Sequence, residues 1–370
     1  LSTIYYSLSA TLVVSILWVF VQYSMAFGGK DFHGIIGGFD KAFFDNIKIT
    51  DIFSTMPTVP EFAFAAFQMT FAIITVALIS GAVVERMNFG AWIIFTVLWS
   101  LFVYTPIAHW VWNPEGWLFK LGVLDFAGGY VVEVASGISA LTAALFIGER
   151  VRYKKDTILP SNIPFVFIGG ALLWVGWFGF NAGSAGAANG LAANAFMTTN
   201  TAAALAGVAW MAIEWMRGGK PSGIGMVSGF VAGMVAITPA AGFVDIKASI
   251  IIGLVAGALC YFFVVIVKKA LGYDDSLDVF GIHGMAGTWG LIATGIFANP
   301  EINPAGTGLL FGNGGQLVKQ FTGIAAVYAF AIAGTLIVLL VTKLFVKLRV
   351  EPQEEIYGLD LVMHGERLDG

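Results

Sequence analysis

The stretch "DFAGGYVVE", residues 125–133, places two carboxylates inside a run that otherwise has the composition of a membrane-spanning helix. Insertion scales put the cost of a charged side chain at the centre of a bilayer at about 2.5–3.5 kcal/mol. Acidic residues at such depth are therefore rare, and each is a candidate for function. Asp125 and Glu133 are the first candidates in this chain.

The composition of the chain favours a membrane protein. Hydrophobic residues make up 58% of its 370 residues and charged residues only 11%, whereas roughly 25% of a soluble domain is charged. Too few polar side chains remain to cover a water-exposed surface. The 46 glycines suit closely packed membrane helices, because small residues let backbones approach one another. The single cysteine, Cys260, excludes an internal disulfide framework and a multi-cysteine metal site.

Ten apolar segments come close to the ~20 residues that an α-helix needs to cross a bilayer. Polar connections rich in Gly and Pro separate them. The sequence therefore predicts an all-α polytopic membrane protein, with a transmembrane domain over residues 1–350 and a polar tail over 351–370. The predicted spans are residues 4–27, 61–83, 91–112, 126–147, 163–182, 195–216, 222–243, 248–268, 279–298 and 317–346.

The distribution of Lys and Arg predicts the orientation, because cytoplasmic loops carry an excess of both. Loops on one side hold thirteen of the 19 basic residues, and those on the other side hold six. With ten spans, both ends of this chain are expected in the cytoplasm, in a multi-pass protein of the cell (inner) membrane. The thirteen include the run "ERVRYKKD", residues 149–156, which either sets this topology or contacts lipid headgroups or a partner.

Each acidic candidate has a structural interpretation beside the functional one. Asp125, at the outer end of the fourth predicted span, can cap a helix N-terminus, serve a site, or do both. On a continuous α-helix, Glu133 would lie ~12 Å deeper than Asp125 and within ~80° of the same face. Glu133 is then either a core carboxyl that bridges helices or part of a functional path. Burial favours the neutral, proton-carrying form of its carboxyl.

His283, in "DVFGIHGMAG" of the ninth predicted span, is a second ionisable group at comparable depth. It is either a core histidine hydrogen-bonded between helices or, together with Glu133, part of a proton-capable pathway.

Aromatic residues are the third element. Phe67 and Phe71 are spaced i, i+4 on one helix face, Trp112 ends the third predicted span, and Phe180 and Ser184 end the fifth. Singly, each fits ordinary packing or an interfacial belt. Together they could form a cage for a small cation, in which π faces attract the ion and a hydroxyl accepts its hydrogen bond.

The chain carries no Gly-rich phosphate loop, nucleophile elbow or cluster of metal ligands. The sequence therefore predicts that the protein is not an enzyme, holds no cofactor and binds no nucleic acid.

Several motifs resemble those of the Amt/Mep/Rh ammonium transporter family, in the same order along the chain. They are "DFAGG" (125–129), "GWFGFNAGSAG" (176–186), "ITPAAGFV" (237–244), "DVFGIHGMAG" (278–287) and "GLDLVMHGE" (358–366). The resemblance implies a homotrimer with a narrow pore through each protomer, built from two inverted halves. It also makes docking of a PII-type signal protein at the cytoplasmic mouth plausible.

The resemblance further implies roles for the candidate residues. The positions of Phe67, Trp112 and Ser184 match the outer ammonium-recruitment site of the family, with Asp125 as the acid beside it. Those of Phe71 and Phe180 match the phenyl gate below that site.

Deeper in the pore, His283 matches the second of two paired histidines, and Thr238 falls where the family lines this region. The chain departs from the pattern at Glu133, where the commonest bacterial members have the first histidine and some fungal-type members have Glu. The family's usual first span is also absent from this sequence, which agrees with an N-terminus in the cytoplasm.

Two functions from different classes are compatible with these features. The first is an ammonium transporter that deprotonates NH₄⁺, conducts NH₃ and moves the proton separately through Glu133 and His283. The alternative is an ammonium sensor, in which the same pocket binds without conducting and signals to a cytoplasmic output. A neutral-gas channel of Rh type fits less well, because the cage of Phe67, Trp112 and Ser184 is suited to a cation.

Overall fold

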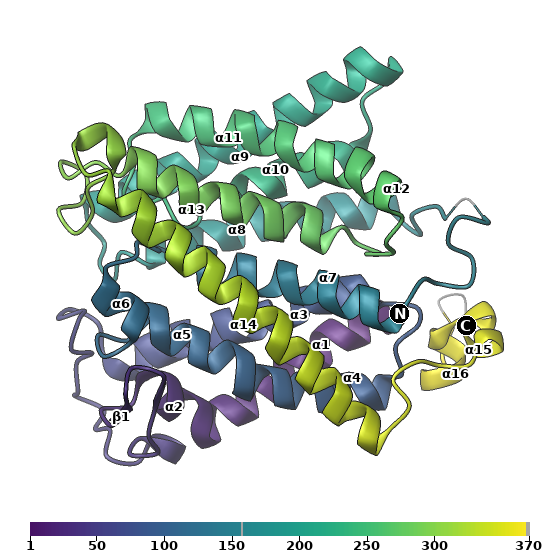
Figure 1. The fold of residues 1–370 in the computed structure, drawn as a ribbon, viewed down its shortest axis with the longest axis horizontal. Coiled ribbons are helices and arrows are strands. Elements are labelled where there is room, and N and C mark those ends of the chain that lie inside the picture. The colour runs from purple at the N-terminus through teal and green to yellow at the C-terminus, as the bar shows by residue number, and fades with distance from the viewer. Residues whose placement is uncertain (157, 368–370) are drawn as a thin grey trace.

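Long apolar helices account for most of the chain in the computed structural model, which describes residues 1–156 and 158–367 (Figure 1). Within these residues, eight helical stretches are long and apolar enough to cross a membrane. Their helices are α1 (Ser2–Leu17) with α2 (Tyr23–Phe27), α3 (Glu61–Val83), α4 (Phe89–Trp99) with α5 (Thr105–Trp112) and α6 (Trp117–Leu121), α7 (Ala135–Ile147), α8 (Ile163–Gly183), α9 (Gly190–Gly218), α11 (Ile246–Tyr261) with α12 (Lys268–Leu271), and α14 (Gly315–Phe345).

Two shorter stretches complete the ten predicted segments. They are α10 (Gly223–Ile237) and α13 (Met285–Phe297), the latter preceded by the π-helical turn η6 (Phe280–Gly284). Further π-helical turns lie within or before the long helices, namely η1 (Trp18–Gln22), η3 (Ser100–Tyr104), η4 (Gly129–Val134) and η5 (Phe262–Val267). The predicted all-α polytopic architecture is confirmed.

Polar side chains at helix starts explain where several spans begin. The side chains of Asn88, Asn162, Asn189, Ser222 and Asp245 each accept a backbone N–H from the first turn of the helix that follows. Such caps satisfy donors that no preceding turn can reach. They mark the starts of helices whose interiors are mostly apolar.

The helices form two groups with different cores. The first group contains α1, α3, α4, α5 and α7 around large buried side chains such as Trp18, Trp92 and Trp99. The second contains α9, α10, α11 and α13 and is rich in buried alanine. In Figure 1 the second group lies above the first, and α14 runs diagonally across the front.

Small residues allow the helices of the second group to pack with their backbones close together. A Cβ added at Gly233 would lie 2.3 Å from the Ala202 carbonyl oxygen, and one added at Gly257 would lie 2.4 Å from that of Ala206. Backbones this close allow only glycine at the contact, as in closely packed membrane helices.

The two ends of the bundle differ. At one end, the hairpin of β1 (Asp31–Phe32) and β2 (Ile36–Gly37) and the short helices η2 (Ala42–Phe44) and η7 (Leu309–Phe311) lie in the connections. The buried His109 holds this hairpin, since its Nε2 lies 2.9 Å from Asp31 Oδ1.

At the other end, which we call the termini-bearing end, α15 (Pro352–Tyr357) and α16 (Leu359–His364) pack near the start of α1 (Figure 1). Residues 368–370 of the predicted tail lie outside the described part of the chain.

Candidate functional site

Glu133 and His283 form a buried pair between the two helix groups. Glu133 Oε2 lies 2.7 Å from His283 Nδ1, and the two residues are only 2% and 7% exposed. Glu133 belongs to η4 and His283 to η6, so both side chains project from π-helical turns. Single π-turns inside helices are rare and occur often at functional sites.

Glycines bring the two segments together. A Cβ at Gly137 would lie 2.2 Å from the Gly284 nitrogen, and one at Gly287 would lie 2.6 Å from the Glu133 Cβ. Only hydrogen fits at these contacts. The close backbone approach allows a carboxyl and an imidazole from different helices to share a hydrogen bond.

The pair is part of a repeat that the sequence also shows. Asp125 precedes Glu133 by the same interval as Asp275 precedes His283, and Gly137 and Gly287 follow at equal intervals. The carboxylate of Asp275 accepts the Phe280 N–H at 2.7 Å at the start of η6. The end of α7 lies beside the start of η6, because Arg150 bonds to Asp274, so the two segments run in opposite directions.

Asp125 caps the helix that carries Glu133. Its carboxylate oxygens accept the N–H groups of Gly128, Gly129 and Tyr130 at 2.6–2.8 Å. The helix begins only at Gly129 and opens with π-helical geometry. The expectation that Asp125 and Glu133 share one continuous α-helix is therefore wrong, because residues 125–128 form the cap.

Four aromatic rings from three helices converge, as the cage hypothesis requires. The ring centroid of Phe71 lies 4.9 Å from that of Phe67, 5.2 Å from that of Trp112 and 4.6 Å from that of Phe180. Ser184 lies one turn beyond Phe180 and donates its hydroxyl to the Phe180 carbonyl at 2.7 Å. This bond leaves the lone pairs of Ser184 Oγ free to accept a hydrogen bond.

A hydrogen bond joins the aromatic cage directly to the loop of residues 125–128. Trp112 Nε1 donates to the backbone carbonyl of Asp125 at 3.2 Å. The backbone of Phe126 in turn donates to the carbonyl of Pro239, the residue after Thr238. The structure therefore brings the predicted residues of the second, third, fourth and fifth spans to one region.

Thr238 has a partner that sequence analysis missed. Trp177 Nε1 donates to the Thr238 hydroxyl at 2.8 Å, and that hydroxyl donates to the Met234 carbonyl. Trp177 lies one turn before Phe180 on α8, and this spacing from a predicted gate residue is the signal that could have identified it.

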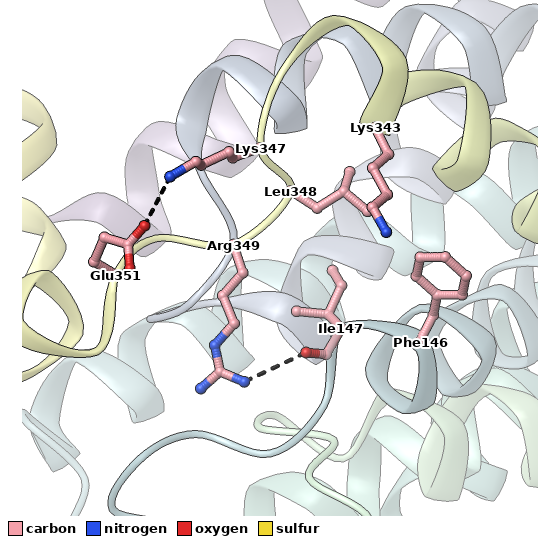
Figure 2. Close-up of a pocket in the computed structure, with 7 residues that line it drawn as sticks. All are labelled: Phe146, Ile147, Lys343, Lys347, Leu348, Arg349 and Glu351. Atoms are coloured by element: carbon pink, nitrogen blue, oxygen red, sulfur yellow. Dashed lines mark hydrogen bonds and ion pairs between the residues drawn. The ribbon is translucent and has the colours of Figure 1, made fainter.

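An open cavity at the termini-bearing end is separate from these residues. It lies between the end of α7 and the link from α14 to α15, where Phe146, Lys343 and Arg349 line it (Figure 2). Phe146 is about three and a half helical turns beyond Glu133, so the cavity is distinct from the buried pair.

A bundle of bilayer-length apolar helices with a carboxyl–imidazole pair inside defines a polytopic membrane protein with a polar centre. Within this class, the sequence model of the Ammonium Transporter Family matches residues 1–368, and the chain belongs to that family. The family is one of transporters, not of enzymes.

Individual relatives agree with this assignment. The chain is 49% identical over 368 residues to an ammonium transporter of Bacillus subtilis (strain 168), covering 99% of this chain and 90% of the relative. The crystal structure of Saccharomyces cerevisiae Mep2 is similar with a TM-score of 0.89 at 39% identity, covering 96% of this chain and 82% of that one. A solved structure described as a sensor Amt protein has a TM-score of 0.85 at 30% identity, covering 96% and 88%.

Proposed function

We propose that this protein conducts ammonium across the cell membrane, taking up NH₄⁺ at the aromatic cage and carrying NH₃ and a proton separately past Glu133 and His283. The observation that carries the proposal is the buried 2.7 Å contact between these two side chains, within the same bundle as a cage of converging rings. Membership of a transporter family supports the substrate class.

Recruitment follows from the chemistry of the cage. The faces of Phe67 and Trp112 attract a cation, and the Ser184 hydroxyl accepts a directional N–H bond. Na⁺ has no N–H to donate, so the hydroxyl favours ammonium over it. The carboxylate of Asp125 adds negative charge nearby, although backbone N–H groups already occupy its oxygens.

Passage requires NH₄⁺ to lose its proton, because transfer of a bare cation into a dry core is prohibitive. NH₄⁺ gives NH₃ and H⁺ near Asp125, and neutral NH₃ passes between Phe71 and Phe180. The proton moves through the Glu133–His283 pair, in which either side chain can hold it. NH₃ and H⁺ recombine on the far side, so one positive charge crosses for each ammonium.

Currents from reconstituted proteoliposomes test this mechanism. Glu133→Ala is expected to abolish the ammonium-dependent current, whereas Glu133→His restores an ionisable partner for His283 and keeps it. An unchanged current in Glu133→Ala would exclude the relay while leaving ammonia conduction open.

A second function, ammonium sensing, is favoured by the similarity to the structure described as a sensor Amt protein. In that case the same cage binds ammonium, and the helices transmit binding to the termini-bearing end. Tight ammonium binding by purified protein that carries no current would identify a sensor.

We further propose a homotrimer in the inner membrane, with residues 1–350 as the transmembrane domain and both ends of this chain in the cytoplasm. Exposed apolar side chains on α8, such as Phe165, Leu172 and Val175, support burial against lipid or a second copy. A PII-type regulator is the proposed partner at the cytoplasmic face. Native mass spectrometry tests the trimer, and labelling of a cysteine placed after Glu351 with an impermeant reagent tests the orientation.

A further inference from the structure

Gln320, on α14, holds a backbone segment of the candidate site although it is 196 residues away in sequence. Its side-chain amide pairs with Leu124 in both directions: Oε1 accepts the Leu124 N–H at 2.8 Å, and Nε2 donates to the Leu124 carbonyl at 2.9 Å. Nε2 also donates to the Leu291 carbonyl at 3.2 Å, and Oε1 also accepts from Gln316 Nε2 at 3.2 Å. The amide is fully buried, and all of its hydrogen-bonding capacity is used.

Leu124, the residue that Gln320 holds, directly precedes Asp125, whose backbone carbonyl joins the loop to the aromatic cage. The Asp125 carbonyl, next in the chain, is the acceptor for Trp112 Nε1. The backbone N–H of Tyr130 donates to the Asp125 carboxylate, and its side-chain hydroxyl donates to the backbone carbonyl of Gln320 at 2.8 Å. Residues 122–128 lie between α6 and η4 outside any helix, so side chains and a few backbone bonds, such as that from Phe126 to Pro239, hold this backbone instead of a helical ladder.

We propose that Gln320 is a positioning residue for the outer cation site, which orients the Trp112 indole by fixing the backbone at Leu124 and Asp125. The inference rests on the proposed ammonium site at Trp112. Gln320 itself does not touch the ion. Without its clamp, Leu124 loses both backbone hydrogen bonds to the Gln320 amide, so the adjacent Asp125 carbonyl is held less firmly and the contact that holds the indole face toward the cage weakens.

The first test is Gln320→Met, which keeps the approximate volume and removes every hydrogen bond of the amide. In proteoliposomes the half-saturating ammonium concentration is expected to rise about fivefold, the factor that corresponds to one net hydrogen bond. The maximal current should stay within about twofold, because the Glu133–His283 pair is untouched. An unchanged half-saturating concentration overturns the proposal.

A double-mutant cycle separates positioning from general destabilisation. Trp112→Phe keeps an aromatic face but has no N–H for the Asp125 carbonyl, so in this background Gln320→Met should shift half-saturation little further. Independent, additive shifts overturn the proposal, because they mean that Gln320 does not act through the indole.

A matched control is Asn194→Leu. Asn194 Nδ2 also donates to two backbone carbonyls, those of Ala241 and Val244 at 3.2 and 3.0 Å, but it does not bond to residues 122–128. Half-saturation should be unchanged in this variant. An equal shift in Asn194→Leu overturns the specific role of Gln320. If Gln320→Met does not fold, Gln320→Glu replaces it with the same criteria, because it keeps an acceptor for the Leu124 N–H but sets a carboxyl group instead of the amide donors opposite the Leu124 and Leu291 carbonyls.

Ammonium binding to the purified protein distinguishes failure of this inference from failure of the proposed function. If the wild type binds ammonium but carries no current, conduction is excluded. The double-mutant cycle is then measured with dissociation constants for ammonium, and the same shift is expected for Gln320→Met. If the wild type neither binds nor conducts, both the proposed function and the inference fall.

Discussion

The hydrogen bond between Glu133 and His283 joins two side chains that can each hold the same proton. Their 2.7 Å separation is short for a nitrogen–oxygen contact, as in bonds with charge on one partner. Because Nδ1 of His283 faces Glu133, Nε2 is the ring nitrogen left to meet ammonia in the proposed mechanism. A carboxyl at this position gives the pair a proton acceptor that is negatively charged when deprotonated, whereas a second imidazole would be neutral in that state.

Glu133→Gln tests the need for that acceptor. Glutamine keeps the size of the side chain and can still bond to His283, but it does not exchange a proton. We expect the ammonium-dependent current in proteoliposomes to fall about a hundredfold or more, the lower range for a positioned acid–base group. A current of wild-type size would mean that charge bypasses the pair.

Asp125 combines a structural and a proposed functional role, and two variants separate them. Asp125→Ala leaves three N–H groups without their acceptor, at a cost of about 1–3 kcal/mol for each that stays unpaired. Asp125→Asn keeps one oxygen acceptor and removes the charge. Thermal melting in detergent should therefore show a lower Tm for Ala than for Asn. Equal Tm values would contradict the capping role.

At the scale of elements, the long spans could be predicted from the sequence, but their ends only where polar residues mark them. The predicted segment 61–83 coincides with α3, which follows Pro60. The predicted segment 222–243 overruns α10, which ends at Ile237 before Pro239. Residues 239–243 are apolar and buried, and hydropathy alone does not distinguish a buried turn from a helix.

The residues of the site could be predicted better than the contacts that hold them. Glu133 and His283 stand out because an ionisable group in an apolar run is conspicuous. Gln320 and Trp177 do not stand out, since one amide or indole near a helix interior suits many partners. Their bonds to Leu124 and Thr238 depend on how distant helices cross, which the local sequence does not encode.

The crossing of η4–α7 with η6–α13 gives a prediction at the same scale. In Gly137→Ala the new methyl group would lie 2.2 Å from the Gly284 nitrogen, so the two segments must separate. Overpacking of this kind costs about 1–3 kcal/mol. We expect a lower Tm and loss of current, because the Glu133–His283 bond is stretched.

The matched control is Gly169→Ala on α8, where an added Cβ meets nothing within 4 Å. Its Tm and current should remain at the wild-type level, since alanine is a better helix former than glycine. If both variants behave alike, the close approach at Gly137 is not what holds the pair.

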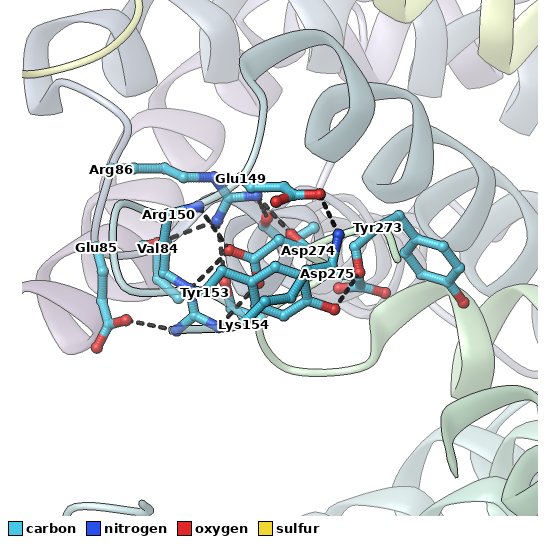
Figure 3. A network of polar contacts seen from close by, with 12 residues as sticks. Val84, Glu85, Arg86, Glu149, Arg150, Tyr153, Lys154, Tyr273, Asp274 and Asp275 are labelled. Atoms are coloured by element: carbon cyan, nitrogen blue, oxygen red, sulfur yellow. Dashed lines mark hydrogen bonds and ion pairs between the residues drawn. The ribbon is translucent and has the colours of Figure 1, made fainter. Parts of the chain in front are cut away.

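At the scale of the whole molecule, an ionic network at the termini-bearing end ties the two helix groups together (Figure 3). Arg150, after α7, bonds to the buried Asp274, before η6, through Nε and Nη2 at 2.9 and 2.8 Å. Its Nη1 reaches Glu85, after α3, at 2.5 Å. Arg86 donates to the Asp274 carbonyl at 2.6 Å. The network therefore fixes, at the termini-bearing end, both segments that carry the buried pair.

The charge of Asp274 makes this tie sensitive to pH. Burial alone would raise the pKa of its carboxyl, but the hydrogen bonds and charge of Arg150 outweigh burial and hold the pKa below its usual value. A carboxylate with a lowered folded pKa stabilises fully above its unfolded pKa, about 3.9, and less as pH falls through the folded value.

The variant Asp274→Asn separates this charge from the remaining hydrogen bonds, because asparagine keeps an acceptor for Arg150 but does not titrate. It leaves the largely buried Arg150 guanidinium without its buried counter-charge and with only the half-exposed Glu85 as an ionic partner, and breaking a buried pair costs up to about 3–5 kcal/mol. At pH 7 the Tm of the variant should therefore lie well below that of the wild type. As the pH is lowered below about 4, the wild type loses the same interaction and the two Tm values should converge. Melting curves between pH 3 and 7 measure both effects, and a gap that stays constant over this range would show that the network joins the two groups by packing rather than by the charge of Asp274.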